Sequence, residues 1–194
     1  MTQVKVCGLM TLGDIAIVNA EHPDYAGFVL AGGRHHVSDE TLQTLTASLD
    51  PQICKVAVVV EPDIRHLLRL HAQGLIDAVQ LHRVSRKRTI NALQQAGLMV
   101  ISRVDLSAPS TVADIALLDA GDGSGQTLPW DQLPPVAQPL MLAGGLDATN
   151  VRQAIQAVAP QIVDASSRLE TNGHKDAAKV KAFVEAVRQT KEEK

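Results

Sequence analysis

Short apolar runs alternate with amphipathic stretches along most of the chain. Each apolar run is almost continuously hydrophobic, which is typical of strands that are buried on both faces of a parallel sheet. Eight such runs lie at residues 4–7, 25–30, 54–60, 78–81, 98–103, 115–119, 140–143 and 162–165. The pattern therefore predicts eight strands.

Stretches with helical spacing of apolar residues follow most of these runs. They lie at residues 12–20, 62–71, 85–95, 149–158 and 176–189, and a further helix is expected after Ser38, which is a good N-cap. Pro62 suits the first turn of its helix. The stretches 107–112 and 130–133 are short, so we expect a weak or missing helix after the fifth strand.

Eight strands, most of them followed by a helix, predict a (β/α)8 TIM barrel of the α/β class. The alternative is an open doubly wound sheet. The count of eight, together with polar residues where the strands end, favours the barrel. The chain has 194 residues and short loops, so we expect a single domain that spans residues 1–194.

Composition narrows the classes of function. The net charge of −3 and the 2% content of aromatic residues argue against nucleic acid as a partner. No apolar window is long enough to span a membrane, and no signal peptide is recognisable. The two cysteines, Cys7 and Cys54, form neither a disulfide framework nor a paired metal-ligand motif. We therefore expect a cytoplasmic protein with no nucleic acid, membrane or metal partner.

Polar side chains collect at the C-terminal ends of the predicted strands, where barrel enzymes build their active sites. Strand alternation places Cys7 on a face with Lys5, so Cys7 points into the barrel if Val4 and Val6 face the helices. Taken alone, Cys7 favours a small core residue, and Asp119 fits a loop cap as well as a catalytic group. The candidate positions are Cys7, Arg34, His35, Gln80, His82, Asp119, Asp164, Ser166 and Ser167.

Glycine turns follow the sixth and seventh strands. Gly123-Ser124-Gly125 and Gly144-Gly145 let backbone N–H groups approach an oxyanion closely, and Ser166-Ser167 adds hydroxyl donors. Barrels often hold a phosphate at the loops after strands seven and eight. One Gly-Gly pair only indicates a tight turn, but two glycine turns beside Ser-Ser favour a phosphate site.

In their order and spacing, the short motifs of this chain resemble those of the phosphoribosylanthranilate isomerase family of tryptophan biosynthesis. The resemblance runs from Val4 to about Arg188. Its motifs are Lys5-Val6-Cys7-Gly8, Gly27-Phe28-Val29, Lys55-Val56-Ala57-Val58-Val59-Val60, Val79-Gln80-Leu81-His82, Leu117-Leu118-Asp119, Gly123-Ser124-Gly125, Leu142-Ala143-Gly144-Gly145-Leu146, Val163-Asp164-Ala165-Ser166-Ser167 and Asn172-Gly173-His174-Lys175-Asp176.

The resemblance implies an Amadori rearrangement of N-(5′-phosphoribosyl)anthranilate to 1-(2-carboxyphenylamino)-1-deoxyribulose 5-phosphate, without cofactor or metal. It assigns the base to Cys7 and the acid to Asp119. It also implies an arginine after strand two for the benzoate carboxylate. The glycine turns and the backbone after strand eight would hold the phosphate. The expected partner is thus a small-molecule phosphosugar, bound by a monomer or a homodimer.

The chain departs from the family pattern in its loops. The strict position of the carboxylate-binding arginine is His35, and the arginine falls one residue earlier, at Arg34, so either residue remains a candidate. Arg83 and Arg168 stand where glycine is usual, and Asp122 replaces a glycine beside the phosphate turn. We expect these changes to affect affinity more than chemistry, because Cys7 and Asp119 are both kept.

Two rival functions remain open. One is a related isomerase acting on the phosphosugar aminoaldose of histidine synthesis, a family that generally uses paired aspartates where this chain has Cys7 and Asp119. The other is a non-catalytic phosphate-binding barrel, which the departures at the arginine and glycine positions favour.

Overall fold

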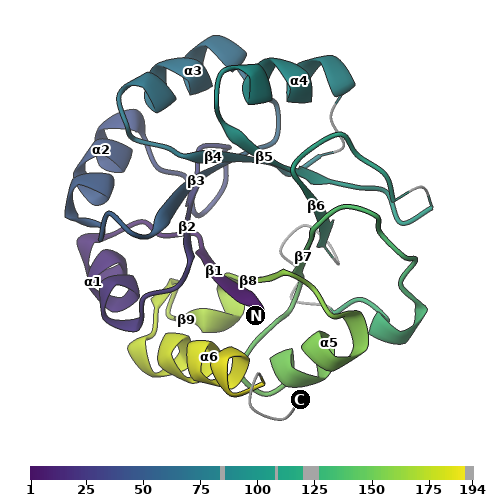
Figure 1. Cartoon of the computed structure of the whole chain (residues 1–194). Helices are drawn as coiled ribbons and strands as arrows, with labels where there is room; N and C mark the ends of the chain where they lie inside the picture. The colour runs from purple at the N-terminus through teal and green to yellow at the C-terminus, as the bar shows by residue number, and fades with distance from the viewer. Residues whose placement is uncertain (84–85, 108, 120–126, 191–194) are drawn as a thin grey trace.

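A computed structural model of the chain describes residues 1–83, 86–107, 109–119 and 127–190. Eight parallel strands form a closed barrel in sequence order, and β1 pairs with β8 to complete the ring (Figure 1). The strands are β1 (Gln3–Cys7), β2 (Tyr25–Val29), β3 (Cys54–Val59), β4 (Ala78–Leu81), β5 (Met99–Arg103), β6 (Ile115–Asp119), β7 (Leu140–Ala143) and β8 (Ile162–Ala165). The predicted (β/α)8 barrel is confirmed, and the open doubly wound sheet is wrong.

Helices surround the strands as α1 (Leu12–Glu21), α2 (Asp39–Ser48), α3 (Ile64–Ala72), α4 (Lys87–Gln95), α5 (Val151–Val158) and α6 (Ala177–Gln189). Asp63 is the N-cap of α3, because its Oδ1 accepts from the backbone N–H of His66. Pro62 therefore lies outside the helix, and its predicted place in the first turn is wrong. Within the described ranges, no helix has both the length and the apolar character that crossing a bilayer requires.

The described residues on either side of β6 form mostly loops. The described residues between β5 and β6 form no helix, and a single 3₁₀ turn, η1 (Trp130–Gln132), is assigned between β6 and β7. Figure 1 shows loops rather than helices outside these strands. The connection after β5 thus matches the expected weak or missing helix.

A short hairpin follows β8. The chain passes through a 3₁₀ turn, η2 (Ser167–Leu169), into the antiparallel strands β9 (Glu170–Thr171) and β10 (His174–Lys175). Asn172 and Gly173 connect them with positive φ angles of 53° and 83°, as a tight hairpin turn requires. Strands of two residues are too short to show alternation, so the sequence pattern did not predict them.

The barrel wall separates two apolar layers. Outward-facing side chains, Val4 and Val6 among them, pack in one cluster with the helices. Inward-facing side chains such as Val56 form a second cluster within the barrel. Because Val4 and Val6 face outward, Lys5 and Cys7 face inward, as the alternation predicted. The barrel interior therefore contains a fully buried lysine next to the thiol.

Candidate active site

A cavity of about 940 Å³ opens at the C-terminal ends of the barrel strands. Its volume is typical of small-molecule sites, and this end of a barrel is where such enzymes place their catalytic groups. The predicted positions that line it are Cys7, Arg34, His35, Gln80, His82, Asp119, Gly144, Gly145, Asp164, Ser166 and Ser167. Gly123, Ser124 and Gly125 lie outside the described residues.

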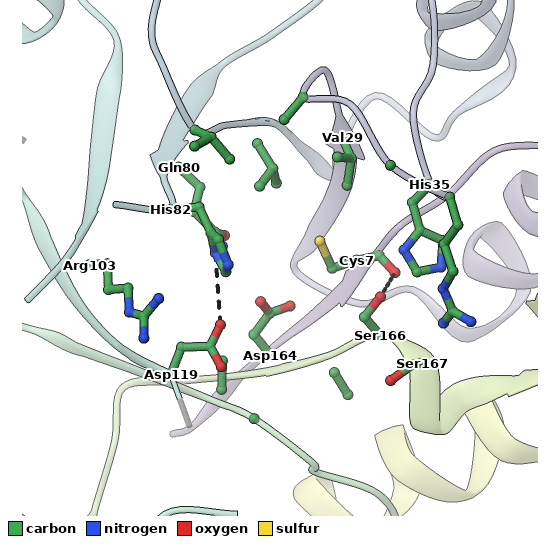
Figure 2. Close-up of a pocket in the computed structure, with 18 of the residues that line it drawn as sticks. Cys7, Val29, His35, Gln80, His82, Arg103, Asp119, Asp164, Ser166 and Ser167 are labelled. Carbon is green, nitrogen blue, oxygen red and sulfur yellow. Dashed lines mark hydrogen bonds and ion pairs between the residues drawn. The ribbon is translucent and has the colours of Figure 1, made fainter. Parts of the chain in front are cut away.

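Cys7 ends β1 and lines this cavity (Figure 2). Its register partner on β2 is Gly27. A Cβ atom at Gly27 would lie 2.7 Å from Cys7 Sγ and 3.0 Å from Lys5 Nζ. The Cys7 thiol and the Lys5 ammonium therefore have room only because residue 27 has no side chain. Cys7 is only 7% exposed, so its thiol is largely sheltered from water.

Lys5 and Asp164 form a buried ion pair next to the thiol. Lys5 Nζ donates to Asp164 Oδ1 at 3.0 Å, across the β1–β8 pairing that closes the barrel. Burial alone would lower the pKa of Lys5, but Asp164 and Cys7 raise it, so the ammonium stays charged. Burial raises the pKa of the Cys7 thiol, the Lys5 ammonium opposes the rise, and Asp164 adds to it. Burial therefore has the largest effect on the pKa of the Cys7 thiol, and the charges of Lys5 and Asp164 act on it in opposite directions.

Asp119 ends β6 on a different part of the ring from Cys7. Its side chain is 10% exposed, and Oδ2 lies 3.8 Å from His82 Nδ1 just after β4. Figure 2 shows this pair beside the cavity that Cys7 also lines. Gln80 lies nearby on β4, and among the described residues its buried Oε1 has no hydrogen-bond partner. The cavity thus combines a thiol, a carboxylate and an acceptor that a ligand O–H or N–H can satisfy.

The loop after β2 brings Arg34 and His35 to the rim of the cavity. Both contact the Glu170 carboxylate: Arg34 Nη2 donates to Oε2, and His35 Nε2 lies 2.8 Å from Oε1. Burial lowers the pKa of His35, and the opposing charge of Glu170 does not reverse this. The ring is therefore neutral at pH 7, and since a carboxylate only accepts, its proton lies on Nε2.

The turn after β7 has the backbone that a phosphate cradle needs. Gly144 and Gly145 have positive φ angles of 96° and 63°, which glycine adopts without strain. Ser166 Oγ donates to the Cys7 carbonyl oxygen at 3.0 Å, and this hydrogen bond links the residue after β8 to the end of β1. In this arrangement Ser167, at the start of η2, is the serine with a hydroxyl for a ligand.

Sequence comparison agrees with this geometry. The sequence model of the family described as "N-(5'phosphoribosyl)anthranilate (PRA) isomerase" matches residues 4–186. The chain belongs to the phosphoribosylanthranilate isomerase family. An N-(5'-phosphoribosyl)anthranilate isomerase of Lacticaseibacillus casei strain BL23 is 45% identical over 191 residues, which cover 97% of this chain and 96% of that protein.

Solved structures of the phosphoribosylanthranilate isomerase family have the same barrel. The structure of TrpF from Jonesia denitrificans matches with a TM-score of 0.86 and 33% identity, and the match covers 98% of each chain. A phosphoribosyl anthranilate isomerase in complex with reduced 1-(o-carboxyphenylamino)-1-deoxyribulose 5-phosphate matches with a TM-score of 0.82 and 26% identity, over 97% of this chain and 100% of the other.

At the two positions where the resemblance led us to expect glycine, arginine is present without straining the backbone. Arg83 and Arg168 both line the cavity, and neither has a positive φ angle. Arg83 Nη1 lies 3.8 Å from Glu61 Oε1, and Arg168 Nη1 lies 3.9 Å from Asp147 Oδ2. Arg168 therefore does not strain its turn, and it brings a cation to the part of the cavity lined by Gly144, Gly145 and Ser167. Asp122 lies outside the described residues.

Three residues were missing from the predicted site. Lys5 shares the inward face of β1 with Cys7, so alternation alone could locate it. Arg103 ends β5 and lines the cavity, and its position at a strand end was the available signal. Glu170 lies on a strand of two residues, which is too short to show alternation in the sequence. Within the described ranges, no three His, Cys, Asp or Glu side chains are grouped so as to hold a metal ion.

Proposed function

We propose that this chain converts N-(5′-phosphoribosyl)anthranilate into 1-(2-carboxyphenylamino)-1-deoxyribulose 5-phosphate, the isomerase step of tryptophan biosynthesis. One observation carries the proposal beyond family membership. The ends of β1 and β6 bring Cys7 and Asp119 to a single cavity, whose other walls offer cations and a glycine turn. An acid and a base on separate walls of one cavity are what an aldose–ketose rearrangement needs.

In this proposal Asp119 gives a proton to the furanose ring oxygen. The C1′–O bond breaks, and the nitrogen lone pair forms a C=N bond. The Cys7 thiolate then takes the proton from C2′, and the electron pair moves to the nitrogen to give an enolamine that tautomerises to the ketone. Lys5 supports the second step, because its ammonium stabilises the thiolate against the effect of burial.

Arg34, rather than His35, suits the anthranilate carboxylate. His35 is neutral and its Nε2 proton points at Glu170, so its other ring nitrogen is an acceptor and repels a carboxylate. Arg34 uses Nη2 for Glu170, and a guanidinium has five N–H donors in total. Its side chain is 61% exposed at the rim, where a substrate can reach it.

The phosphate in this proposal lies against the Gly144-Gly145 turn and the backbone at Ser167, with Arg168 beside it. Gly123, Ser124 and Gly125 remain predicted contributors. The extent of the domain over residues 1–194, the cytoplasmic location and the choice between monomer and homodimer also remain predictions.

A fluorescence assay on substrate made in situ from anthranilate tests the function. We expect turnover by the wild-type chain, and a loss of at least about 10²-fold in both Cys7→Ala and Asp119→Asn, because each removes one proton-transfer group. Cys54→Ala removes the other free thiol and should keep full activity. Undiminished turnover in Cys7→Ala would refute the base assignment. Product binding without turnover would favour the non-catalytic barrel, and turnover of the histidine-pathway aminoaldose alone would favour the related isomerase.

A further inference from the structure

We infer that Glu170 is a positioning residue, which holds Arg34 in place for the substrate carboxylate and fixes the proton of His35. The inference deepens the proposed function and rests on its assignment of Arg34. Glu170 lies on β9, in the hairpin after β8, whereas Arg34 and His35 lie in the loop after β2. The contact between Arg34 and Glu170 therefore joins two segments that are 136 residues apart in sequence.

The Glu170 carboxylate is buried and fully engaged. Its side chain is 4% exposed, although Arg34 above it is 61% exposed. Oε2 accepts from Arg34 Nη2 at 2.8 Å, while Oε1 accepts from Lys175 Nζ at 2.6 Å and lies 2.8 Å from His35 Nε2. Burial raises the pKa of Glu170, but Lys175, His35 and Arg34 outweigh it and lower that pKa, so the group stays ionised at neutral pH.

Lys175 anchors this carboxylate from below. It lies opposite Glu170 in the β9–β10 register, and its side chain is 1% exposed. Its Nζ also donates to the Ser166 carbonyl oxygen at 3.3 Å, and its backbone N–H donates to Asp14 Oδ1 at 3.0 Å. A second lysine, Lys179, donates to the Glu170 carbonyl oxygen at 2.6 Å. The hairpin thus holds Glu170 rigidly, and the carboxylate can only face the β2 loop.

The β2 loop needs such an anchor. Arg34 follows Gly32 and Gly33, so the two preceding residues have no side chain that could pack against the arginine. An exposed arginine loses considerable side-chain entropy when it is fixed on a ligand. Because Glu170 already fixes one edge of the guanidinium, the substrate carboxylate meets donors that are partly ordered in advance. Glu170 is neutralised chiefly by Lys175, so it does not by itself repel the ligand.

Steady-state kinetics of Glu170→Gln test the inference. We expect KM to rise about fivefold with kcat within about twofold, since the lost interaction acts in substrate binding and its Arg34 partner is 61% exposed, which keeps the contribution of the pair modest. Glu185→Gln is the matched control, because it breaks an exposed pair with Lys181 on α6, and it should behave as wild type. Glu170→Asp keeps a negative charge for the buried Lys175 ammonium, so this variant should fold. Its KM should lie between those of wild type and Glu170→Gln.

A double variant separates positioning from simple structural support. Arg34→Ala/Glu170→Gln should bind no more weakly than Arg34→Ala alone, because Glu170 acts through Arg34. Additive losses would overturn the inference, as would a fall in kcat at constant KM. A lower KM in Glu170→Gln would show that Glu170 competes with the substrate for Arg34, and would also overturn it. Calorimetric binding of reduced 1-(o-carboxyphenylamino)-1-deoxyribulose 5-phosphate compares the same variants without turnover. If the wild-type chain were inactive, the proposed function would be rejected, but the binding measurement would still test the role of Glu170.

Discussion

Replacing Lys5 by methionine removes the cation next to the Cys7 thiol. The change is best made in an Asp164→Asn background, because Lys5→Met alone would leave a buried carboxylate without its partner. Asp164→Asn keeps an oxygen to accept from Lys5 Nζ. It removes a negative charge that raises the pKa of Cys7, so it should lower that pKa. Adding Lys5→Met should then raise it.

The structure sets the size of the second shift. Cys7 Sγ and Lys5 Nζ both lie within 3.0 Å of the point where a Gly27 Cβ would be. They are therefore at most about 6 Å apart, and at an effective dielectric constant of about 20 their attraction is roughly 3 kcal/mol. That energy corresponds to about two pH units in the pKa of Cys7. Solvent screening is small, since Lys5 is 0% and Cys7 7% exposed.

Ultraviolet absorbance of the thiolate gives this pKa without any need for turnover. The titration is made in a Cys54→Ala background, since Cys54 is the second free thiol and burial raises its pKa to about 12. In wild type, kcat/KM should increase with pH up to the pKa of Cys7, which burial raises above its ordinary value. Equal thiol pKa values in the Asp164→Asn protein and the Lys5→Met/Asp164→Asn protein would refute the electrostatic role of Lys5.

Two further predictions concern packing and capping. Gly27→Ala should lower the free energy of unfolding in urea by about 1–3 kcal/mol and should lower kcat, because its Cβ would lie 2.7 Å from Cys7 Sγ. The control Gly13→Ala, at an exposed position in α1, should leave stability unchanged or raise it by up to about 1 kcal/mol, with activity unchanged. Equal effects of the two substitutions would contradict the steric argument. Asp14→Ala should lower the free energy of unfolding by about 3 kcal/mol at an unchanged m-value, because the carboxylate accepts hydrogen bonds from the backbone N–H groups of Met10, Thr11 and Lys175. A loss under about 0.5 kcal/mol would show that water replaces these hydrogen bonds.

The strands were predictable because each is a compact apolar run between turn signals. All eight predicted runs lie within one residue of the observed strand at either end, and β4, β6, β7 and β8 agree fully. Register made the site predictable too, since parallel strands bring their C-terminal ends to one rim. Helix starts were less certain where two signals place them at different residues, as Pro62 does for the first turn and Asp63 for the N-cap.

The part of the site that depends on long-range pairs was not predictable. The bonds from Lys5 to Asp164 and from Arg34 to Glu170 join residues 159 and 136 positions apart, and no periodicity records such a pairing. The choice between Arg34 and His35 likewise needed the position of Glu170, because the neighbour decides which ring nitrogen carries the proton. Sequence spacing located the residues that line the cavity, but it did not show the ion pairs that set the charge around them.

The pairing of β1 with β8 has a consequence for biosynthesis of the protein. A ribosome completes the strand that carries Cys7 near the beginning of translation, but Asp164, which neutralises Lys5, is added 159 residues after Lys5. Until β8 docks, the lysine next to the thiol has no ion-pair partner on that strand, and the ring is open along one seam. Such non-local closure is slow relative to local folding. A nascent or truncated chain that lacks β8 therefore lacks the Lys5–Asp164 ion pair, and its barrel wall is open between β1 and β7.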